Sequence, residues 1–340
     1  MTIISICIII ISIKYIKFCF EEGYFFTMKK INILIAVIIL SLSAHLYSCT
    51  SVDANMFPDN GKINIMTSLF PQYDFARHIA GDKANVLLLL PPGTESHVFD
   101  PRPGDMLNIY NADLFIYTGS YMEPWAGEII RGISQDNKLL VVDCSTGIEY
   151  INESEEHDAH SHGEHALDPH IWLDPTLAML MVDNILEALC QKDYENAEYY
   201  IENANNYKNM LQILDDDIFA AIEEAERDVL VFGGRFAYIY FLKRYNLKYV
   251  TVYDSCSANS EPSVRKVNDV ANFIKENRIP CIYHEEFANP SLAKAIAKQT
   301  NITYELFSTA HNITKTDFGN EVTFIDIMYR NLENIKKGLN

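Results

Sequence analysis

Five of the chain's ten histidines lie in residues 153–175, which read ESEEHDAHSHGEHALDPHIWLDP. Four of them alternate with acidic residues at HxxH and HxH spacing: His157, His160, His162 and His165. The fifth, His170, follows an Asp-Pro pair that stiffens the backbone. Imidazole nitrogens and carboxylates bind zinc at about 2 Å, so this stretch predicts metal binding. Flexible imidazoles would make weak, multiple contacts that collect zinc and pass it to His170. The alternative is a solvated low-complexity loop.

Other candidate ligands follow apolar runs that we expect to be strands. His97 comes after ANVLLLL, His311 comes after ITYELF, and Glu285 continues the run PCIYH. Ligands of open parallel sheets bind beyond the carboxyl ends of the strands. A tetrahedral zinc site takes four such groups, supplied here by separate loops. We expect His78, on a predicted helix, and His284, in a predicted strand, to be structural or surface residues.

The elements that must position these side chains follow the same alternating pattern in two parts of the chain. Apolar runs alternate with amphipathic stretches in residues 63–193 and again in residues 228–340. Continuous apolar runs alternating with helices indicate a parallel sheet that is covered on both faces. We therefore predict an α/β protein of two lobes, each a parallel sheet flanked by helices. The His-rich loop, residues 152–168, belongs to the first lobe.

A long helix is expected between the two lobes, in residues 194–227. The segment has no Gly or Pro, and its apolar residues share one helical stripe. At 1.5 Å per residue it would form a rod on the order of 50 Å long. We interpret it as one connecting helix, although a coiled-coil arm has the same pattern.

The N-terminal region predicts export. Lys29 and Lys30 precede an apolar run of about a dozen residues, which is shorter than the roughly 20 that a spanning helix needs. The following LYSC looks like a bacterial lipobox, in which Cys49 would receive the lipid. We expect residues 1–48 to be a signal region with Met28 as the true start; the alternative is a first transmembrane anchor. Residues 49–62 would be a tether.

The formal net charge of −19 argues against nucleic acid as a partner and suits a protein that meets cations. Four cysteines follow the lipobox, at positions 144, 190, 256 and 281, without CxxC spacing. They allow one disulfide but do not suggest a structural zinc finger. Cys256 is either a soft ligand or a buried inert thiol; free cysteines are usually buried.

The chain resembles the metal-binding lipoproteins of zinc and manganese ABC importers, the cluster A-I solute-binding proteins. The motifs that carry the resemblance are LLLLPPGTESHVFDPRPGD, the His-rich acidic loop, LDPHIWLDP, the long helix, SEPSVRKV and FIDIMYRNLENIKKGL. It covers residues 62–340. It implies two lobes joined by one rigid helix, with a metal in the cleft. It also implies delivery to a membrane permease driven by a cytoplasmic ATPase.

Carried over residue by residue, the resemblance places the first two histidine ligands at His97 and His170. The third ligand position falls on Arg235, whose guanidinium has no lone pair for a metal. The fourth falls near Ser308, three residues before His311. We therefore predict a site of His97, His170 and His311, with Glu285 as a ligand or as an acceptor beside it. Arg235 would pair with Glu285 or another carboxylate, or else the cleft receives an anion or a metal complex.

The leading functional prediction is a monomeric zinc receptor, anchored by lipid on the outer face of a bacterial membrane, that is not an enzyme. Imidazole-rich sites favour zinc over manganese, which prefers oxygen ligands, although Mn2+ remains an alternative cargo. An adhesin on the same scaffold is a further alternative. A zinc hydrolase is the weakest, because it needs an open coordination position with a general base beside it, and HExxH is absent.

Overall fold

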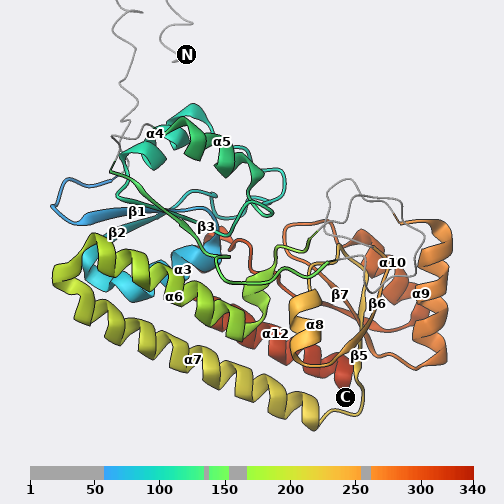
Figure 1. The fold of residues 1–340 in the computed structure, drawn as a ribbon. Helices are drawn as coiled ribbons and strands as arrows, with labels where there is room; N and C mark the ends of the chain where they lie inside the picture. The colour runs from blue at the N-terminus through green and yellow to red at the C-terminus, as the bar shows by residue number, and fades with distance from the viewer. Residues whose placement is uncertain (1–56, 134–137, 153–166, 254–261) are drawn as a thin grey trace, which may run out of the picture. The chain divides into compact units, whose positions relative to one another are not determined.

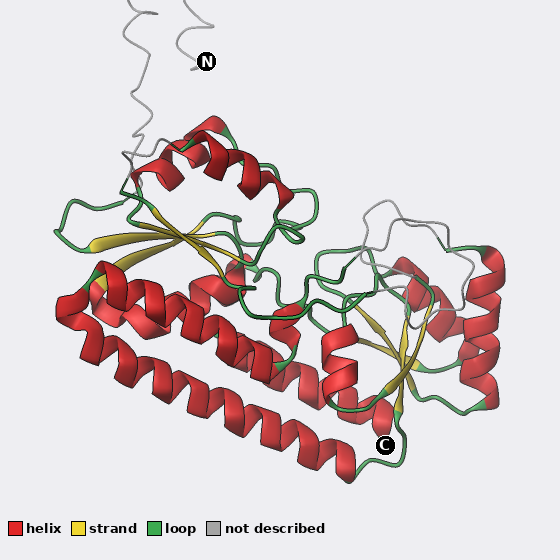
Figure 2. Cartoon of the chain, viewed as in Figure 1, coloured by secondary structure: helices red, strands yellow, loops and turns green. Residues whose placement is uncertain are grey.

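The computed structural model of the protein describes residues 57–133, 138–152, 167–253 and 262–340. These residues form two parallel four-stranded sheets flanked by helices (Figure 1, Figure 2). The predicted α/β class with two lobes is therefore confirmed. The predicted signal region and several candidate residues lie outside the described residues: Cys49, His157, His160, His162, His165 and Cys256.

The first sheet has the strand order β2-β1-β3-β4. Its strands are β1 (Ile63–Thr67), β2 (Ala84–Leu88), β3 (Leu114–Tyr117) and β4 (Leu140–Asp143). Helices α4 (Pro103–Asn111) and α5 (Pro124–Gly132) cover one face, and α3 (Phe70–Ala80) and α6 (Pro175–Lys192) cover the other (Figure 1). Because side chains alternate along a strand, the neighbours Ile65 and Met66 enter the cores on opposite faces.

The second sheet repeats this arrangement with the order β6-β5-β7-β8. Its strands are β5 (Val229–Phe232), β6 (Lys248–Thr251), β7 (Cys281–His284) and β8 (Thr303–Leu306). Helices α9 (Val264–Glu276) and α10 (Ser291–Thr300) pack on the face of Val231 and Ile282. Helices α8 (Ile239–Arg244) and α12 (Phe324–Leu339) pack on the face of Leu230 and Tyr283.

One long helix, α7, connects the two sheets as predicted. It runs from Ala197 to Glu223, 27 residues, after a 3-10 turn at Tyr194–Asn196. It is shorter than the predicted 194–227, and its length is about 40 Å. It lies beside α6 and α3 and ends near the start of β5 (Figure 1). All five residues of its predicted apolar stripe are buried: Tyr200, Ala204, Tyr207, Leu211 and Leu214.

The last helix, α12, is a second link between the sheets. It packs on the second sheet and also against α7 and α3. Its first residue, Phe324, donates its backbone N–H to the buried carboxylate of Asp74 in α3 at 3.0 Å. Tyr207 in α7 donates its hydroxyl to the same carboxylate at 2.8 Å. Asp74 therefore joins three helices at one point.

The sequence reading missed helices α5, α6 and α11 (Lys315–Gly319). Helix α6 begins with Pro175 in its first turn, and Asp174 caps it by accepting from the backbone N–H of Thr176 at 2.8 Å. Cys144, Cys190 and Cys281 are free thiols. Within the described residues, no helix has both the length and the apolar character needed to cross a membrane.

Candidate metal centre

His97 lies in the loop between β2 and α4, which several hydrogen bonds hold in place. Its backbone N–H donates to the Glu95 carboxylate at 3.0 Å. Gly93, whose φ of +83° favours glycine, donates its N–H to Ile313 O at 2.8 Å. The Asn312 side chain donates to Pro91 O and to Thr94 O, both at 2.8 Å. The loop that carries His97 is thus bonded to the loop that carries His311.

His170 is fully buried between an Asp-Pro pair and helix α6. The next three residues, Ile171–Leu173, form a 3-10 turn whose side chains all enter the core. Asp168 accepts two hydrogen bonds from His170, one from the backbone N–H at 2.8 Å and one from Nδ1 at 2.7 Å. The motif LDPHIW therefore combines a core anchor with a carboxylate that orients the imidazole.

His311 belongs to the loop after β8, and it is 8% exposed. Its backbone carbonyl accepts from the N–H of Phe70, at the start of α3, at 3.0 Å. Trp172 donates its ring N–H to Thr309 O, two residues before His311, at 2.7 Å. This loop leaves the second sheet, but it is bonded to elements that follow β1 and precede α6.

The three histidines converge. Their ligand atoms all lie within 4.8 Å of one another, and no other group of this kind occurs in the part of the chain that the structure describes. The ring centroids are 5.7 Å apart for His97 and His170, 4.8 Å for His97 and His311, and 4.7 Å for His170 and His311. A tetrahedral zinc ion with bonds of about 2 Å holds its nitrogens about 3.3 Å apart. The rings therefore need to move by only about an ångström to share one ion.

Hydrogen bonds select the nitrogen that each ring offers. Because carboxylate oxygens only accept, Asp168 takes the Nδ1 hydrogen of His170 and leaves Nε2 as the ligand atom. The Thr309 hydroxyl donates to Glu286 at 2.7 Å, so it accepts from Nδ1 of His311, which likewise leaves Nε2. Nε2 of His97 and of His311 is buried, and no described residue hydrogen-bonds to it. Such outer partners orient metal ligands and raise their basicity.

The surroundings of His97 and His311 disfavour the protonated form of both imidazoles. Burial, reinforced by His170 and Arg235, lowers the pKa of His97 to about 3. Burial also lowers the pKa of His311 well below its usual value, and His170 and His97 add to the effect. A neutral imidazole carries the lone pair that a metal needs, so near neutral pH both residues are ready to bind a cation.

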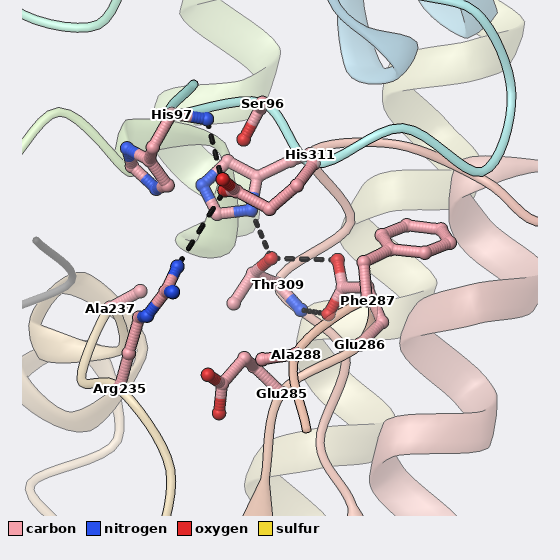
Figure 3. Close-up of a pocket in the computed structure, with 11 residues that line it drawn as sticks. Ser96, His97, Arg235, Ala237, Glu285, Glu286, Phe287, Ala288, Thr309 and His311 are labelled. Atoms are coloured by element: carbon pink, nitrogen blue, oxygen red, sulfur yellow. Dashed lines mark hydrogen bonds and ion pairs between the residues drawn. The ribbon is translucent and has the colours of Figure 1, made fainter. Parts of the chain in front are cut away.

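A pocket opens in front of His97 and His311 (Figure 3). Its remaining lining residues are Glu95, Ser96, Arg235, Ala237, Glu285, Glu286, Phe287, Ala288 and Thr309. Glu285 is therefore beside the site but outside the group of three histidines. Its carboxylate accepts from the backbone N–H groups of Arg235 and of Glu285 itself, while burial raises its pKa. This placement favours Glu285 as a hydrogen-bond acceptor beside the metal site over Glu285 as a ligand.

Arg235 lines the same pocket as His97 and His311, and its side chain is 25% exposed. Its Nη1 lies 3.8 Å from Glu95 Oε1, so the ion-pair partner is Glu95 from the first lobe. His78 and His284 are outside the cluster, as expected: each Nδ1 contacts a nearby backbone carbonyl, of Asp74 and of Glu285. Ser308 binds the Asn331 side chain through its N–H and carbonyl.

Sequence reasoning missed the outer partners Asp168, Thr309, Glu286 and Glu95. Asp168 could have been identified from the sequence, because it lies two residues before His170 in the motif LDPHIW. Glu286 and Thr309 lie 23 residues apart, and only the adjacency of β7 and β8 brings them together. No spacing rule in the sequence could reveal that contact.

Comparison with known proteins gives a match over most of the chain. Residues 65–338 match the family model described as ZnuA, zinc-uptake complex component A periplasmic. The chain is 34% identical over 283 residues to the high-affinity zinc uptake system protein ZnuA of Bacillus subtilis, covering 82% of this chain and 88% of that protein. It is 32% identical to the zinc-binding lipoprotein AdcA of Streptococcus pneumoniae, over 91% of this chain but 61% of AdcA.

Two solved structures extend the likeness to three dimensions. The metal-dependent lipoprotein YcdH of Bacillus subtilis matches with a TM-score of 0.71 at 32% identity, over 82% of this chain and 99% of that one. The Zn(II)-bound ZnuA-like domain of Streptococcus pneumoniae AdcA matches with a TM-score of 0.69 at 28% identity, over 82% and 99%.

Proposed function

Because the chain belongs to the family of zinc-uptake complex component A, we propose that it is a high-affinity zinc receptor that delivers the metal to the permease of an ABC importer. In this role it binds and releases its cargo without transforming it, so it is not an enzyme. The ATPase on the far side of the membrane would drive transport. The relatives named as zinc uptake and zinc-binding proteins support this function.

The observation that carries the proposal is the convergence of three histidines from separate loops on one point. His97 follows β2, His170 precedes α6 and His311 follows β8, yet their ligand atoms lie within 4.8 Å of one another. Three imidazoles form a nitrogen-rich site, and such a site favours zinc over manganese. We propose zinc as the physiological cargo and Mn2+ as a weaker competitor.

The surrounding residues would prepare the site before the ion arrives. Asp168 orients His170 and the pair Thr309–Glu286 orients His311, so little conformational freedom remains for the ion to remove. Glu95, Glu285 and Glu286 line the pocket in front of the cluster and would attract a cation to it. Glu285 would act as an acceptor beside the ion.

We propose further that residues 1–48 are a signal region and that Cys49 carries a lipid that anchors a monomer to the outer face of the membrane. The tether, residues 49–62, would connect the anchor to the lobes at 63–193 and 228–340, with 194–227 between them. A relative named as a lipoprotein and a family described as periplasmic support this location. His157, His160, His162 and His165 would collect zinc near the pocket.

Isothermal titration of the metal-free protein, with a competing chelator for the tight range, tests the zinc assignment. We expect one tightly bound zinc ion per chain, held more strongly than manganese, with weaker additional binding by His157, His160, His162 and His165. A deletion strain should fail to grow under chelation and recover when zinc is added. Tighter binding of manganese than of zinc, or no effect of the deletion on zinc-limited growth, would overturn the proposal.

A further inference from the structure

The histidine cluster supplies three donors, one fewer than the four that a tetrahedral zinc ion takes. Within the described part of the chain, no further His, Cys, Asp or Glu atom joins the group. His170 is fully buried, whereas His97 and His311 line the pocket. The remaining coordination position of an ion held by these rings therefore faces the pocket.

Arg235 stands in that pocket with few partners for its guanidinium. The group has five N–H donors, and the side chain is three-quarters buried. Its ion pair with Glu95, at 3.8 Å, is longer than a hydrogen bond. None of the side chains or carbonyls in the described ranges accepts a hydrogen bond from the guanidinium; its backbone N–H is bound instead.

The backbone holds Arg235 where it is. The Glu285 carboxylate accepts the N–H of Arg235, and it packs so closely on Gly234 that a Cβ there would lie 1.8 Å from Oε2. Only a glycine permits that approach. From this fixed point the guanidinium extends toward His97, while the Glu285 carboxylate stays behind it (Figure 3). The chain thus directs a permanent cation to the side of the cluster where the ion's last ligand must be.

A cation beside a divalent ion is repulsive unless an anion lies between them. We propose that the protein carries its metal with a small exogenous anion as the fourth ligand, held between the ion and the guanidinium of Arg235. The inference rests on the proposed function. The ligand class is a monovalent anion that has a donor lone pair and accepts hydrogen bonds, such as chloride or a small carboxylate. Guanidinium groups bind such anions through charge-assisted hydrogen bonds.

The cobalt(II) form of the full chain tests this inference, because the visible bands of Co2+ report its ligands directly. The metal-loaded protein, in perchlorate solution, is titrated with sodium chloride in one arm and sodium acetate in another. We expect at least one anion to shift the bands saturably and to tighten zinc binding in parallel. The more tightly bound anion identifies the subclass.

Arg235→Gln should weaken the anion's affinity by about tenfold or more, since a hydrogen bond to a charged group is lost. Arg330→Gln is the matched control, because Arg330 pairs with Asp317 on an exposed surface. The inference would be overturned if neither anion shifted the Co2+ bands, or if the bands of the Arg235 variant shifted as much as those of the wild type. A loss of metal binding in Glu95→Gln with no anion response in the wild type would show that Glu95 supplies the fourth ligand. A wild-type chain that binds neither zinc nor cobalt would instead refute the proposed function.

Discussion

His170 donates its Nδ1 hydrogen to Asp168 at 2.7 Å, and both side chains are buried. The same carboxylate oxygen accepts the backbone N–H of His170 at 2.8 Å. One oxygen therefore fixes both the backbone and the ring of the ligand. A carboxylate–histidine pair of this kind raises the basicity of the metal-binding nitrogen as well as orienting it.

Asp168→Asn should weaken zinc binding while the fold persists. Asparagine keeps the shape of the side chain but removes the charge that supports the imidazole, so we expect a loss of about tenfold to a hundredfold in affinity. Competition titration with a chelator measures it. Asp82→Asn, at an exposed position, is the control. Equal affinities for the Asp168 variant and the wild type would mean that the pair only holds the loop.

His311→Ala should cost more than the loss of an outer partner, because it removes a ligand. We expect the zinc affinity to fall by more than the roughly hundredfold upper range for outer-shell changes. His78→Ala is the matched control, since His78 is on α3 and outside the cluster. Zinc binding that survives in the His311 variant at near wild-type strength would remove this residue from the ligand set and revive Glu285 as a ligand.

The metal-free protein should lose stability as the pH falls below about 6.5. The pKa of His97 is lowered to about 3 by burial, and burial also lowers that of His311. In the unfolded chain both residues titrate near 6.5. Between these values the unfolded chain binds more protons, so the free energy of unfolding falls with falling pH.

Thermal midpoints measured from pH 7 to pH 5 check this effect. His97→Gln should flatten the pH dependence, whereas His78→Gln should keep it, because His78 is on α3 and outside the histidine cluster. If the His97 variant and the wild type lost stability in parallel, the imidazole of His97 would not be the group that resists protonation.

The sequence was sufficient to predict the two parallel sheets and to single out the three histidines that converge. Both signals are carried by short stretches of the chain. Apolar runs identify strands, and loops at their carboxyl ends carry ligands, so His97, His170 and His311 could be found one at a time. Helix α6 was missed because it begins with an unbroken apolar run, residues 177–182, in which no helical period is visible. The hydrogen bond between Thr309 and Glu286 depends on which strands are neighbours in the sheet. The ion pair between Arg235 and Glu95 depends on how two loops lie in space. Neither can be found from the sequence.

Asp74 should be important for stability although it is remote from the histidines. Its carboxylate accepts from Tyr207, from the Phe324 N–H and from Arg77 at 2.9 Å. Asp74→Ala leaves these donors without their acceptor, and we expect a loss of about 3–5 kcal/mol in the free energy of unfolding. Tyr207→Phe removes one hydrogen bond and should cost about 1 kcal/mol. Urea unfolding measures both, and similar values for the two variants would contradict a shared network.

Zinc binding should change the relative position of the two lobes little. The loop of His311 leaves the second sheet, but Phe70 and Trp172 of the first lobe donate hydrogen bonds to its carbonyls. Asn312 of the same loop donates in turn to the carbonyl of Pro91 in the first lobe. Helices α7 and α12 both pack against α3, so they restrain the first lobe at a second point. The ligands are thus already assembled, and binding has no large hinge motion to complete.

Small-angle scattering of the metal-free and zinc-loaded protein measures this directly, and we expect equal radii of gyration within error. Asn312→Ala removes both bonds from this side chain to the loop of His97 and provides the contrast. It should weaken zinc binding because part of the assembly must then be completed by the ion. A marked contraction of the wild type on adding zinc would show that the lobes close around the metal, and the rigid site described here would be wrong.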